Sequence, residues 1–440
     1  MSDLAEFAKS LDGELFCPES PGYDAIRRPV NHAYREVRPR LVVLCRSVSD
    51  VVSAITYAAS TGVHIAPRGG GHCFAGRSST DGIVLDLSGL ADISMGVDGV
   101  ATIGAGARLG PAYAELHAFG RTLPAGCGPT VGITGLTLGG GIGLLGRKYG
   151  LTCDRLVGAE VVLADGRVVD CDRDHEPDLF WGLRGAGGGQ FGVVTSLRFD
   201  TVPEPMCTRI EAHWSDVPLE ELVSAWQAWA PEAPDDLTVD LSVVSEPGVP
   251  VQATLFGASL LDEGSTRELL EEFIDQAGAP SRIELRCSLP FHHLKGTFAD
   301  PPEVAERAQR TRSEFFAHSL ADRTLGSLLT QLGAPRTRGR RELTFTAMGG
   351  AYNRVAEDAT AFAHRGERFL LGHIAEPADP WIDGSWETAH ADGSGRVYPN
   401  FPDLALDDWA TAYHAGNYPR LTAVKNAYDP HRFFTFPQAI

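Results

Sequence analysis

The sequence lacks the signals of several large protein classes. Its eight cysteines, scattered from Cys17 to Cys287, include no Cys-x-x-Cys pair. This argues against a disulfide framework and against a structural zinc site, and we expect no bound metal. No run of about 18 uninterrupted apolar residues is present, so no membrane span is predicted. The opening residues, MSDLAE, do not have the basic-then-apolar order of a signal peptide, and we expect a cytoplasmic protein.

Positive charge is scarce as well. The 440 residues include 38 Lys and Arg against 57 Asp and Glu, a formal net charge of −19. Nucleic acids and anionic membranes repel such a chain, so neither is expected as a partner. The length predicts about two or three domains. The composition, 43% hydrophobic and 22% charged residues, is typical of a globular protein.

Glycine, in contrast, is abundant in one part of the chain. Of 49 glycines, 31 lie between residues 61 and 200. The same span carries many Val, Ile and Leu residues, so it is not of low complexity. Dense glycine within an apolar fold indicates tight turns and close approach of the backbone to a large ligand. The first half of the chain is therefore predicted to bind a cofactor.

Hydrophobic patterns predict an α+β fold rather than a doubly wound sheet. In the first half we expect strands and helices in the order strand 40–45, helix 47–62, strands 64–68, 83–87 and 100–106, helix 111–119, and strands throughout 156–198. The composition changes near Val202-Pro203-Glu204-Pro205, which we take as a domain boundary. Beyond it, helices at 219–229 and 265–277 alternate with period-2 strands at 237–243 and 341–348.

Three glycine-rich segments carry the candidate chemistry. The first, PRGGGHCFAG at 67–76, follows a strand, and its consecutive glycines can form an anion-binding nest to which Arg68 adds positive charge. Such a nest is formed by backbone N–H groups and needs no histidine, so the presence of His72 requires a separate explanation. The third, DLFWGLRGAGGGQFGVVT at 178–195, is another glycine nest that leads into an apolar strand.

The second segment, CGPTVGITGLTLGGGIGLLG at 127–146, contains a dinucleotide-binding pattern. Gly141, Gly143 and Gly146 have the GxGxxG spacing. Glu160 follows at about the distance at which that motif has its acidic residue. No clean helix is expected after Gly146, and the next strands form a hairpin instead of a βαβ unit. We therefore reject a Rossmann site, and with it an NAD(P)-dependent reductase.

The order of these motifs resembles that of the berberine bridge enzyme-like FAD-linked oxidases, in the vanillyl-alcohol oxidase / p-cresol methylhydroxylase (PCMH) superfamily of flavoproteins. RGGGH, PTVG with GGGxG, and LFWxLRG with FGVVT occur in this order, and the ending GNYPRL…K…YDP…PQ is also similar. The resemblance covers essentially the whole chain.

The resemblance implies a two-domain α+β flavoprotein. Residues 1–204 would form a PCMH-type FAD-binding domain, 205–400 a central α+β substrate domain with an antiparallel sheet, and 401–440 a segment that returns to the FAD domain. His72 matches the histidine bonded to the flavin 8α-methyl group. The matching FAD-binding positions are Arg68, Gly69, Gly70, Gly71, His72, Cys73, Ala75, Gly76, Cys127, Pro129, Thr130, Gly132, Thr134, Gly135, Leu138, Gly141, Gly143, Val194, Asn400 and Phe401.

Two positions depart from the family pattern. Many relatives have a second covalent link through a cysteine where this chain has Gly128. Cys127 is its neighbour and would reach the flavin only if the loop bulges, so we favour a single bond. A family tyrosine that assists substrate deprotonation is replaced by Phe401, which cannot accept a proton. Tyr398, Tyr352 and Glu342 are the remaining candidates for the catalytic base.

The resulting hypothesis is an FAD-dependent oxidase. We expect hydride transfer from a small organic substrate, a natural-product intermediate or a sugar-like alcohol, with O₂ as the electron acceptor. A flavin dehydrogenase with another acceptor, a cyclase that only contains flavin, and a non-catalytic binding protein stay open as alternatives.

Overall fold

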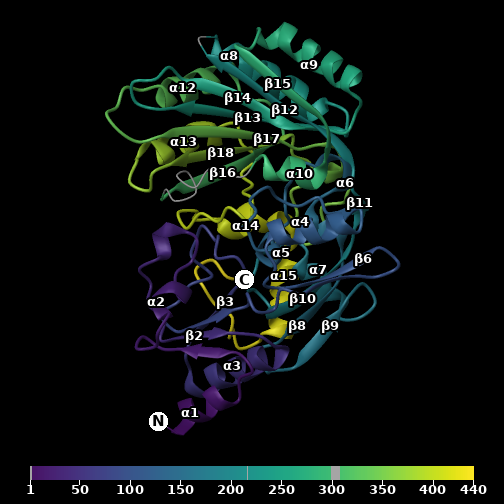
Figure 1. The fold of residues 1–440 in the computed structure, drawn as a ribbon. Helices are drawn as coiled ribbons and strands as arrows, with labels where there is room; N and C mark the ends of the chain where they lie inside the picture. The colour runs from purple at the N-terminus through teal and green to yellow at the C-terminus, as the bar shows by residue number, and fades with distance from the viewer. Residues whose placement is uncertain (1, 216, 299–307) are drawn as a thin grey trace.

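The computed structural model describes residues 2–215, 217–298 and 308–440. In Figure 1 the chain forms two stacked parts, with the N-terminus at the bottom of the lower part. The lower part contains the first 203 residues together with the last helices, and the upper part contains one large sheet with its helices.

The lower part is built on two main sheets. The first has the order β1 (Glu14–Phe16), β2 (Leu41–Leu44), β4 (Ile83–Asp86), β3 (Ile65–Arg68). The second has the order β5 (Ile93–Met95), β6 (Val100–Gly104), β10 (Val193–Asp200), β8 (Leu156–Val162), β9 (Val168–Cys171). The short strands β7 (Arg121–Thr122) and β11 (Val202–Pro203) pair with each other. In the first sheet β2, β4 and β3 are parallel, while the second sheet is antiparallel.

The helices of the lower part come from both ends of the chain. From the N-terminal side they are α1 (Ser2–Lys9), α2 (Tyr23–Ile26), α3 (Val48–Thr61), α4 (Leu109–Ala118), α5 (Ile133–Leu138), α6 (Gly146–Tyr149) and α7 (Pro177–Leu183). From the C-terminal side they are α14 (Trp409–His414) and α15 (Tyr418–Tyr428). Figure 1 shows α15 beside the strands of the lower part, so the end of the chain returns to the half in which it begins.

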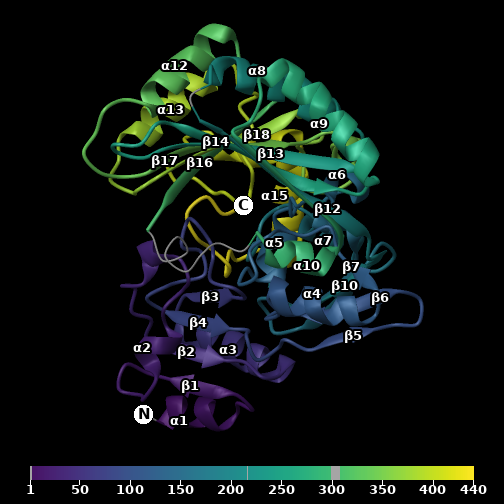
Figure 2. The ribbon, with the colours of Figure 1, turned by 45° about the horizontal axis from the view of Figure 1, so that its top comes forward.

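The upper part contains one antiparallel sheet of seven strands. Its order is β15 (Arg282–Pro290), β12 (Met206–Ser215), β14 (Gln252–Ser259), β13 (Leu237–Ser245), β17 (Arg341–Ala347), β18 (Phe369–Ala375), β16 (Arg310–Phe316). Its helices are α8 (Leu219–Trp229), α9 (Glu263–Ala277), α10 (Phe291–Gly296), α12 (Asp322–Leu332) and α13 (Trp381–His390). Figure 2 shows α8, α9, α12 and α13 over one face of this sheet, with the other face toward the lower part.

Side-chain alternation decides which face of the large sheet is covered. On β13, Val239 and Leu241 pack with α8 residues such as Trp226 in one hydrophobic core. On the opposite face, Ala258 of β14 belongs to the core of the lower part, and Phe315 of β16 packs with a cluster that includes Leu151. A period-2 strand therefore places every second side chain over the lower part.

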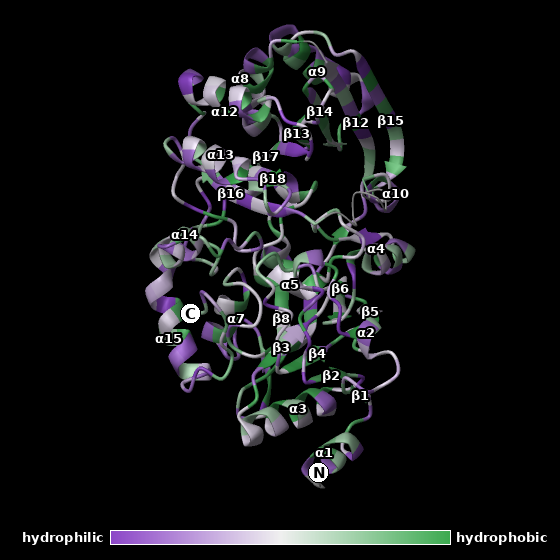
Figure 3. Ribbon diagram, turned by 90° about the vertical axis from the view of Figure 1, so that its left-hand side faces the viewer, coloured by the Kyte–Doolittle hydropathy of each residue, from purple (hydrophilic) through white to green (hydrophobic). Residues whose placement is uncertain are grey.

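The local signals of the first sheet are the ones that the sequence predicts. Ser47 caps α3 through the Asp50 N–H, the Asp50 carboxylate accepts the backbone N–H of Ser47, and Gly62 ends the helix with φ 66°. The strands around β2 and β3 are largely coloured hydrophobic in Figure 3, as expected for strands buried beneath a helix. The α+β prediction with an antiparallel sheet in the central part is confirmed.

One element differs from the prediction. Residues 177–183 lie within the span expected to be strands but form helix α7. Pro177 stands at its first turn with Asp178 beside it, which favours a helix start. The run Leu179-Phe180-Trp181 is fully apolar, so its composition does not distinguish a short buried helix from a buried strand.

Arginine side chains join the two parts. Arg147 of α6 donates to the carbonyls of Leu237 (3.0 Å), Pro231 (2.9 Å), Ala233 and Met348. Arg365 forms a bidentate ion pair with Asp154, at 2.8 and 2.7 Å.

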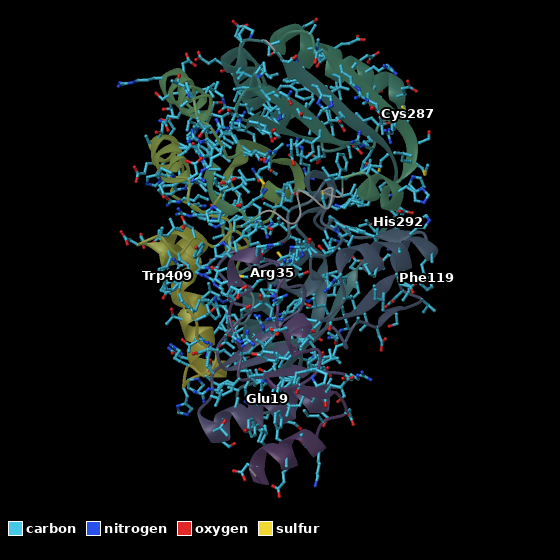
Figure 4. The ribbon with its side chains drawn as sticks, turned by 60° about the vertical axis from the view of Figure 1, so that its left-hand side comes forward. Glu19, Arg35, Phe119, Cys287, His292 and Trp409 are labelled. Carbon is cyan, nitrogen blue, oxygen red and sulfur yellow. The ribbon has the colours of Figure 1, made fainter. Side chains whose placement is uncertain are left out.

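The boundary between the parts reaches the surface at two edges. In Figure 4, Trp409 of α14 and His292 of α10 lie at opposite sides of the molecule near the level at which the parts meet. At the His292 edge, Glu204 accepts the His292 backbone N–H and contacts His117 Nδ1 at 2.5 Å.

Candidate active site

Two glycine-rich loops meet back to back next to β3. A Cβ added to Gly70 would lie 2.2 Å from the backbone nitrogen of Gly132, and one added to Gly132 would lie 2.4 Å from that of Gly70. Gly71 has φ 73°, in the left-handed region that favours glycine. The loops predicted from RGGGH and PTVG therefore form one backbone-lined surface that side chains would fill.

His72 projects from the first loop onto the second. Its Nε2 lies 3.0 Å from the Thr130 Oγ1. Burial lowers the pKa of the imidazole, and the nearby Arg108 charge lowers it further, against the opposing effect of Thr130. The ring is therefore neutral near pH 7, which leaves one nitrogen with a free electron pair for bond formation.

A cavity of about 190 Å³ lies beside Gly69–Gly71. Arg28, Arg68 and Arg108 line it together with Asp86. The buried Arg68 guanidinium donates to the carbonyls of Ile26 (2.8 Å), Arg27 (2.9 Å) and Ser78 (3.0 Å), which fixes the loop. Arg68, which the sequence predicted as a positive charge for the ligand, thus also holds the loop in place. Arg28 and Arg108 add to the positive charge of this cavity.

Arg77, five residues after His72, is a second cation on this loop that the sequence analysis missed. Its Nε and Nη2 are buried and have no hydrogen-bond partner within the part of the chain that the structure describes. The guanidinium lies 4.7 Å from the Phe436 ring centroid, and its Nη1 is next to Gly187 in the third glycine segment. A buried cation without an anion is costly, so this arrangement calls for an anionic ligand or internal water.

Tyr398 binds the GGG turn of the second segment through hydrogen bonds. The Tyr398 hydroxyl accepts the N–H groups of Gly141 (3.0 Å), Ile142 (3.1 Å) and the Asn400 amide (3.0 Å). A Cβ on Gly139 would lie 2.2 Å from the Asn400 Oδ1. Tyr398 is only 3% exposed, and burial raises the pKa of its phenol in spite of these three donors. Its contacts make it a support of the turn.

Tyr352 holds the next residues of the same segment. Its hydroxyl accepts the Gly143 N–H at 3.1 Å and donates to the Gly143 carbonyl at 2.8 Å. Burial raises the pKa of this phenol strongly. Both hydrogen-bonding roles are therefore occupied by one glycine, which leaves Tyr352 without a free site for substrate.

Glu342 lies elsewhere, on β17. Its carboxylate accepts from Ser242 (2.5 Å), Arg340 (2.5 Å) and Thr344 (3.2 Å). It stands on the sheet face that points toward the lower part, since Leu343 and Phe345 pack into the opposite core. Of the three predicted bases, Glu342 is the one on the open sheet face, and its negative charge is balanced by Arg340.

Phe74, whose ring is next to that of Phe401, lines a larger cavity between the two parts. Their ring centroids are 5.3 Å apart, and Phe74 is 37% exposed. The cavity, of about 380 Å³, is lined by residues that include Phe74, Tyr34, Arg310 and Asp403. It is the larger of the two cavities described, and its aromatic lining residues are Tyr34 and Phe74.

Cys127 is engaged by a lysine that the sequence analysis also missed. The buried Lys295 of α10 donates to Cys127 Sγ (3.1 Å) and to the Ala125 carbonyl (3.2 Å). Burial lowers the pKa of this lysine, and the nearby Cys127 opposes that shift. The Cys127 thiol therefore contacts a lysine of helix α10. Because the two residues are far apart in the sequence, no local sequence motif indicates this contact.

The other predicted cofactor positions surround the same loops. Thr134 donates to the Ala105 carbonyl at 2.9 Å, and the Leu138 carbonyl accepts the N–H groups of Gly185 and Gly187. Val194 is buried on β10. Five further residues that were predicted to bind the cofactor lie within the first or the second glycine-rich segment: Cys73, Ala75, Gly76, Pro129 and Gly135. Within the described ranges, no group of His, Cys, Asp and Glu residues is arranged to hold a metal ion.

Comparison with known proteins identifies the family. Residues 39–172 match the model of an FAD binding domain, and residues 397–440 match the berberine and berberine-like model. An uncharacterized FAD-linked oxidoreductase of Bacillus subtilis, YgaK, is 33% identical over 98% of this chain and 97% of its own length. The chain belongs to the berberine bridge enzyme-like family of FAD-linked oxidoreductases, as its motifs predicted.

Solved structures agree with this assignment. The Physcomitrella patens BBE-like 1 protein superimposes with a TM-score of 0.90 at 26% identity, covering 100% of this chain and 99% of that one. The glucooligosaccharide oxidase of Acremonium strictum, which carries a 6-S-cysteinyl, 8α-N1-histidyl FAD, gives 0.89 at 25% identity, covering 100% and 99%. This protein is accordingly an FAD-binding oxidoreductase. None of the helices in the described part of the chain has the length and apolar character that a membrane span requires.

Proposed function

We propose that this protein is an FAD-dependent oxidase that acts on a small natural-product intermediate, with the flavin bonded to His72 and O₂ as the electron acceptor. The observation that carries the proposal is the neutral His72 imidazole, held against Thr130 at the meeting point of two glycine loops. In this proposal residues 1–204 and 401–440 bind the cofactor, and residues 205–400 bind the substrate.

The residues present fit FAD. The two glycine loops offer a backbone surface for a flat or phosphorylated group, and Arg28 and Arg108 line the adjacent cavity with positive charge. The buried Arg77 lacks an anionic partner that a diphosphate or a reduced isoalloxazine would supply. Tyr398 and Asn400 fix the GGG turn from above, and Tyr352 fixes Gly143.

A single covalent bond is part of the proposal. The Acremonium oxidase has both a cysteinyl and a histidyl link, but here Gly128 occupies the family position of the cysteine. The contact of Cys127 with Lys295 gives its thiol a partner other than the flavin. His72 alone would then hold the cofactor.

When bound, FAD supplies a two-electron acceptor that takes hydride from a substrate C–H bond and is reoxidised by O₂. The chain's own contribution is to hold a neutral imidazole at the attachment point and to position the glycine turns. The cavity beside Phe74 supports an aromatic or partly apolar substrate, because the side chains of Phe74 and Tyr34 line it.

Because Phe401 replaces the family tyrosine, a second function is also considered. It is a flavin dehydrogenase or cyclase of secondary metabolism that does not use O₂. A panel of hydroxylated aromatics and oligosaccharides, mixed anaerobically with the purified protein, tests both. We expect bleaching of the flavin absorbance with at least one compound, and one H₂O₂ per product after air is admitted.

The alternatives give different results in the same experiment. A reduced protein that stays bleached in air but is reoxidised by a dye would be a dehydrogenase. Turnover without bleaching or O₂ consumption would indicate a cyclase. Bound flavin that cannot be bleached, even by light and an electron donor, would contradict every enzymatic version and indicate a binding protein.

A further inference from the structure

The amine of one buried lysine ends on a thiol. Lys295 of α10 is 4% exposed, and its Nζ lies 3.1 Å from Cys127 Sγ and 3.2 Å from the Ala125 carbonyl oxygen. The ring centroids of Tyr113 and Phe291 lie 5.1 and 5.5 Å from the same nitrogen. Among the residues that the structure describes, no Asp or Glu forms an ion pair with Lys295. The thiolate of Cys127 is therefore the anion that this buried cation contacts.

The pair can share one proton between nitrogen and sulfur. Burial lowers the pKa of the Lys295 amine, and the nearby Cys127 thiol opposes this shift. While the proton is on nitrogen, the ammonium charge favours the thiolate, which is the form of cysteine that reacts with oxidants. When the proton is lost, the desolvated amine has a free electron pair and is a nucleophile. The contact therefore places a reactive sulfur beside a reactive nitrogen.

The Cys127 thiol is also within reach of small oxidants. Cys127 is half-buried, and Pro129 and Thr130, which follow it in the same loop, are exposed. Four other cysteines are fully buried, and burial raises the pKa of their thiols, which makes them inert. They are Cys45, Cys153, Cys171 and Cys207.

The other half-buried cysteines lack the amine. Cys17 contacts a serine hydroxyl at 3.2 Å, and the Cys287 thiol lies beside the Glu263 carboxylate. A neighbouring negative charge disfavours a thiolate. Within the described ranges, no lysine forms a hydrogen bond with Cys17, Cys73 or Cys287. Cys127 thus differs from them in its partner, and Cys287 offers a matched comparison.

The two side chains come from different parts of the molecule. Lys295 belongs to α10 of the upper part, and Cys127 begins the second glycine-rich segment. A Cβ added to Gly143 would lie 2.1 Å from the carbonyl oxygen of Ala125, so the stretch that Lys295 contacts packs against that segment. A covalent bond between the two side chains would therefore fix α10 to the segment that is expected to bind FAD.

We propose that hydrogen peroxide oxidises this pair and joins Cys127 Sγ to Lys295 Nζ through a covalent sulfur–nitrogen bond. The thiolate first attacks one oxygen of H₂O₂, the O–O bond breaks, and a sulfenic acid and water result after protonation. The Lys295 nitrogen then attacks the sulfur, the S–O bond breaks, and a second water leaves. Overall, RSH, R′NH₂ and H₂O₂ give RS–NHR′ and two H₂O, so the sulfur loses two electrons and the peroxide gains them.

The bond is reversible by thiols. Two equivalents of a thiol return the free Cys127 and Lys295 side chains and are themselves oxidised to a disulfide. H₂O₂ is also the product that the proposed oxidase would release, so the modification would respond to turnover. The chemistry itself requires only the peroxide, which the experiment adds, and the inference therefore goes beyond the proposed function.

The purely structural alternative is that Lys295 only donates to the Ala125 carbonyl and leaves the thiol unchanged. To separate the two, the protein as purified is treated with H₂O₂, free thiols are blocked with iodoacetamide, and the chain is digested with trypsin without reductant. We expect the peptides of Cys127 and Lys295 to be joined, with a mass lower by two hydrogen atoms than their sum. Dithiothreitol should separate them, and trypsin should no longer cleave after Lys295 while the bond is intact.

Three results of this mapping would overturn the proposal. In the first, peroxide converts Cys127 to a sulfinic or sulfonic acid while the Lys295 peptide stays unlinked. In the second, Cys127 remains a free thiol that iodoacetamide blocks. In the third, the Cys127 peptide already carries flavin before peroxide is added. The wild-type protein alone gives each of these results, so the test does not depend on the folding of a variant.

Two variants assign the bond to its partners. Lys295→Met removes the amine but keeps a long side chain, and its Cys127 should proceed to the sulfinic acid without a cross-link. Cys287→Ala removes another half-buried thiol and should keep the Cys127–Lys295 cross-link in full. A Cys127 cross-link that persists in Lys295→Met overturns the assignment of the nitrogen.

Thermal unfolding provides a second readout. The bond would close a loop of 168 positions, and a cross-link of that span stabilises a protein by restricting its unfolded chain. Peroxide treatment should raise the unfolding midpoint of the wild type by about 5 °C, and dithiothreitol should reverse the rise. A rise of the same size in Cys127→Ala would overturn the proposal.

The outcomes distinguish this inference from the proposed function. A colourless protein without bound flavin overturns the proposed function, while a cross-link formed in that protein still supports the modification site. A flavin-containing oxidase in which Cys127 and Lys295 stay unlinked after peroxide treatment overturns the modification site alone.

Discussion

The His72→Ala variant is expected to lose all covalently bound flavin, so that acid or urea releases every flavin from the protein. The reason is that His72 is the one side chain proposed to be bonded to the cofactor, and its neutral ring lies 3.0 Å from Thr130 on the second glycine loop. Flavin that still binds without the bond should also be a weaker hydride acceptor, because the link makes the ring more electron-poor. Visible absorbance of the denatured protein after gel filtration measures the loss.

Cys127→Ala is the matched control for this result. Its thiol contacts Lys295 at 3.1 Å, so the variant should keep its covalent flavin in full. Retained flavin in His72→Ala together with loss in Cys127→Ala would reverse the assignment of the bond. Partial loss in each would indicate two bonds, as in the Acremonium oxidase with its cysteinyl and histidyl links.

The Arg147→Met variant is expected to lower the free energy of unfolding by roughly 3 kcal/mol, since each buried carbonyl left without a donor costs about 1 kcal/mol or more. The methionine fills a similar volume, but the carbonyls of Leu237, Pro231, Ala233 and Met348 lose their donor. Recovered desolvation of the guanidinium offsets part of the loss. The midpoint of thermal or urea unfolding measures the effect, which should be a decrease.

Arg354→Met is the control for the loss of an arginine in the same region. Arg354 follows the 3-10 turn that holds Tyr352, its side chain is 60% exposed, and it pairs with Asp235 at 2.7 Å. An exposed pair contributes about 0–1 kcal/mol, so this variant should unfold almost as the wild type does. Equal midpoints for the two variants would show that Arg147 does not hold the two parts together.

Local features of the fold follow from the sequence. The Ser47 cap, the Gly62 helix end and the alternation at 237–243 depend on neighbouring residues, and the structure reproduces them. Helix α7 was missed because the helix has only seven residues, and its short apolar run, Leu179-Phe180-Trp181, carries too little periodicity to separate a helix from a strand.

The candidate site was predictable only in part, because its chemistry depends on residues that are distant in the sequence. The glycine loops and His72 lie in continuous segments, so sequence motifs are able to indicate them. The contact between Tyr398 and Gly141 spans 257 positions, and it shows that this tyrosine supports a turn. Arg77 lies close to His72 in the sequence, but its packing against Phe436 depends on the return of the chain end to this loop.

The most direct test of the covalent flavoprotein is the intact mass of the fully denatured wild-type chain, compared with the 47.1 kDa of the polypeptide. We predict an increase equal to one FAD. A mass equal to that of the polypeptide, from a native protein that is colourless, would contradict the account.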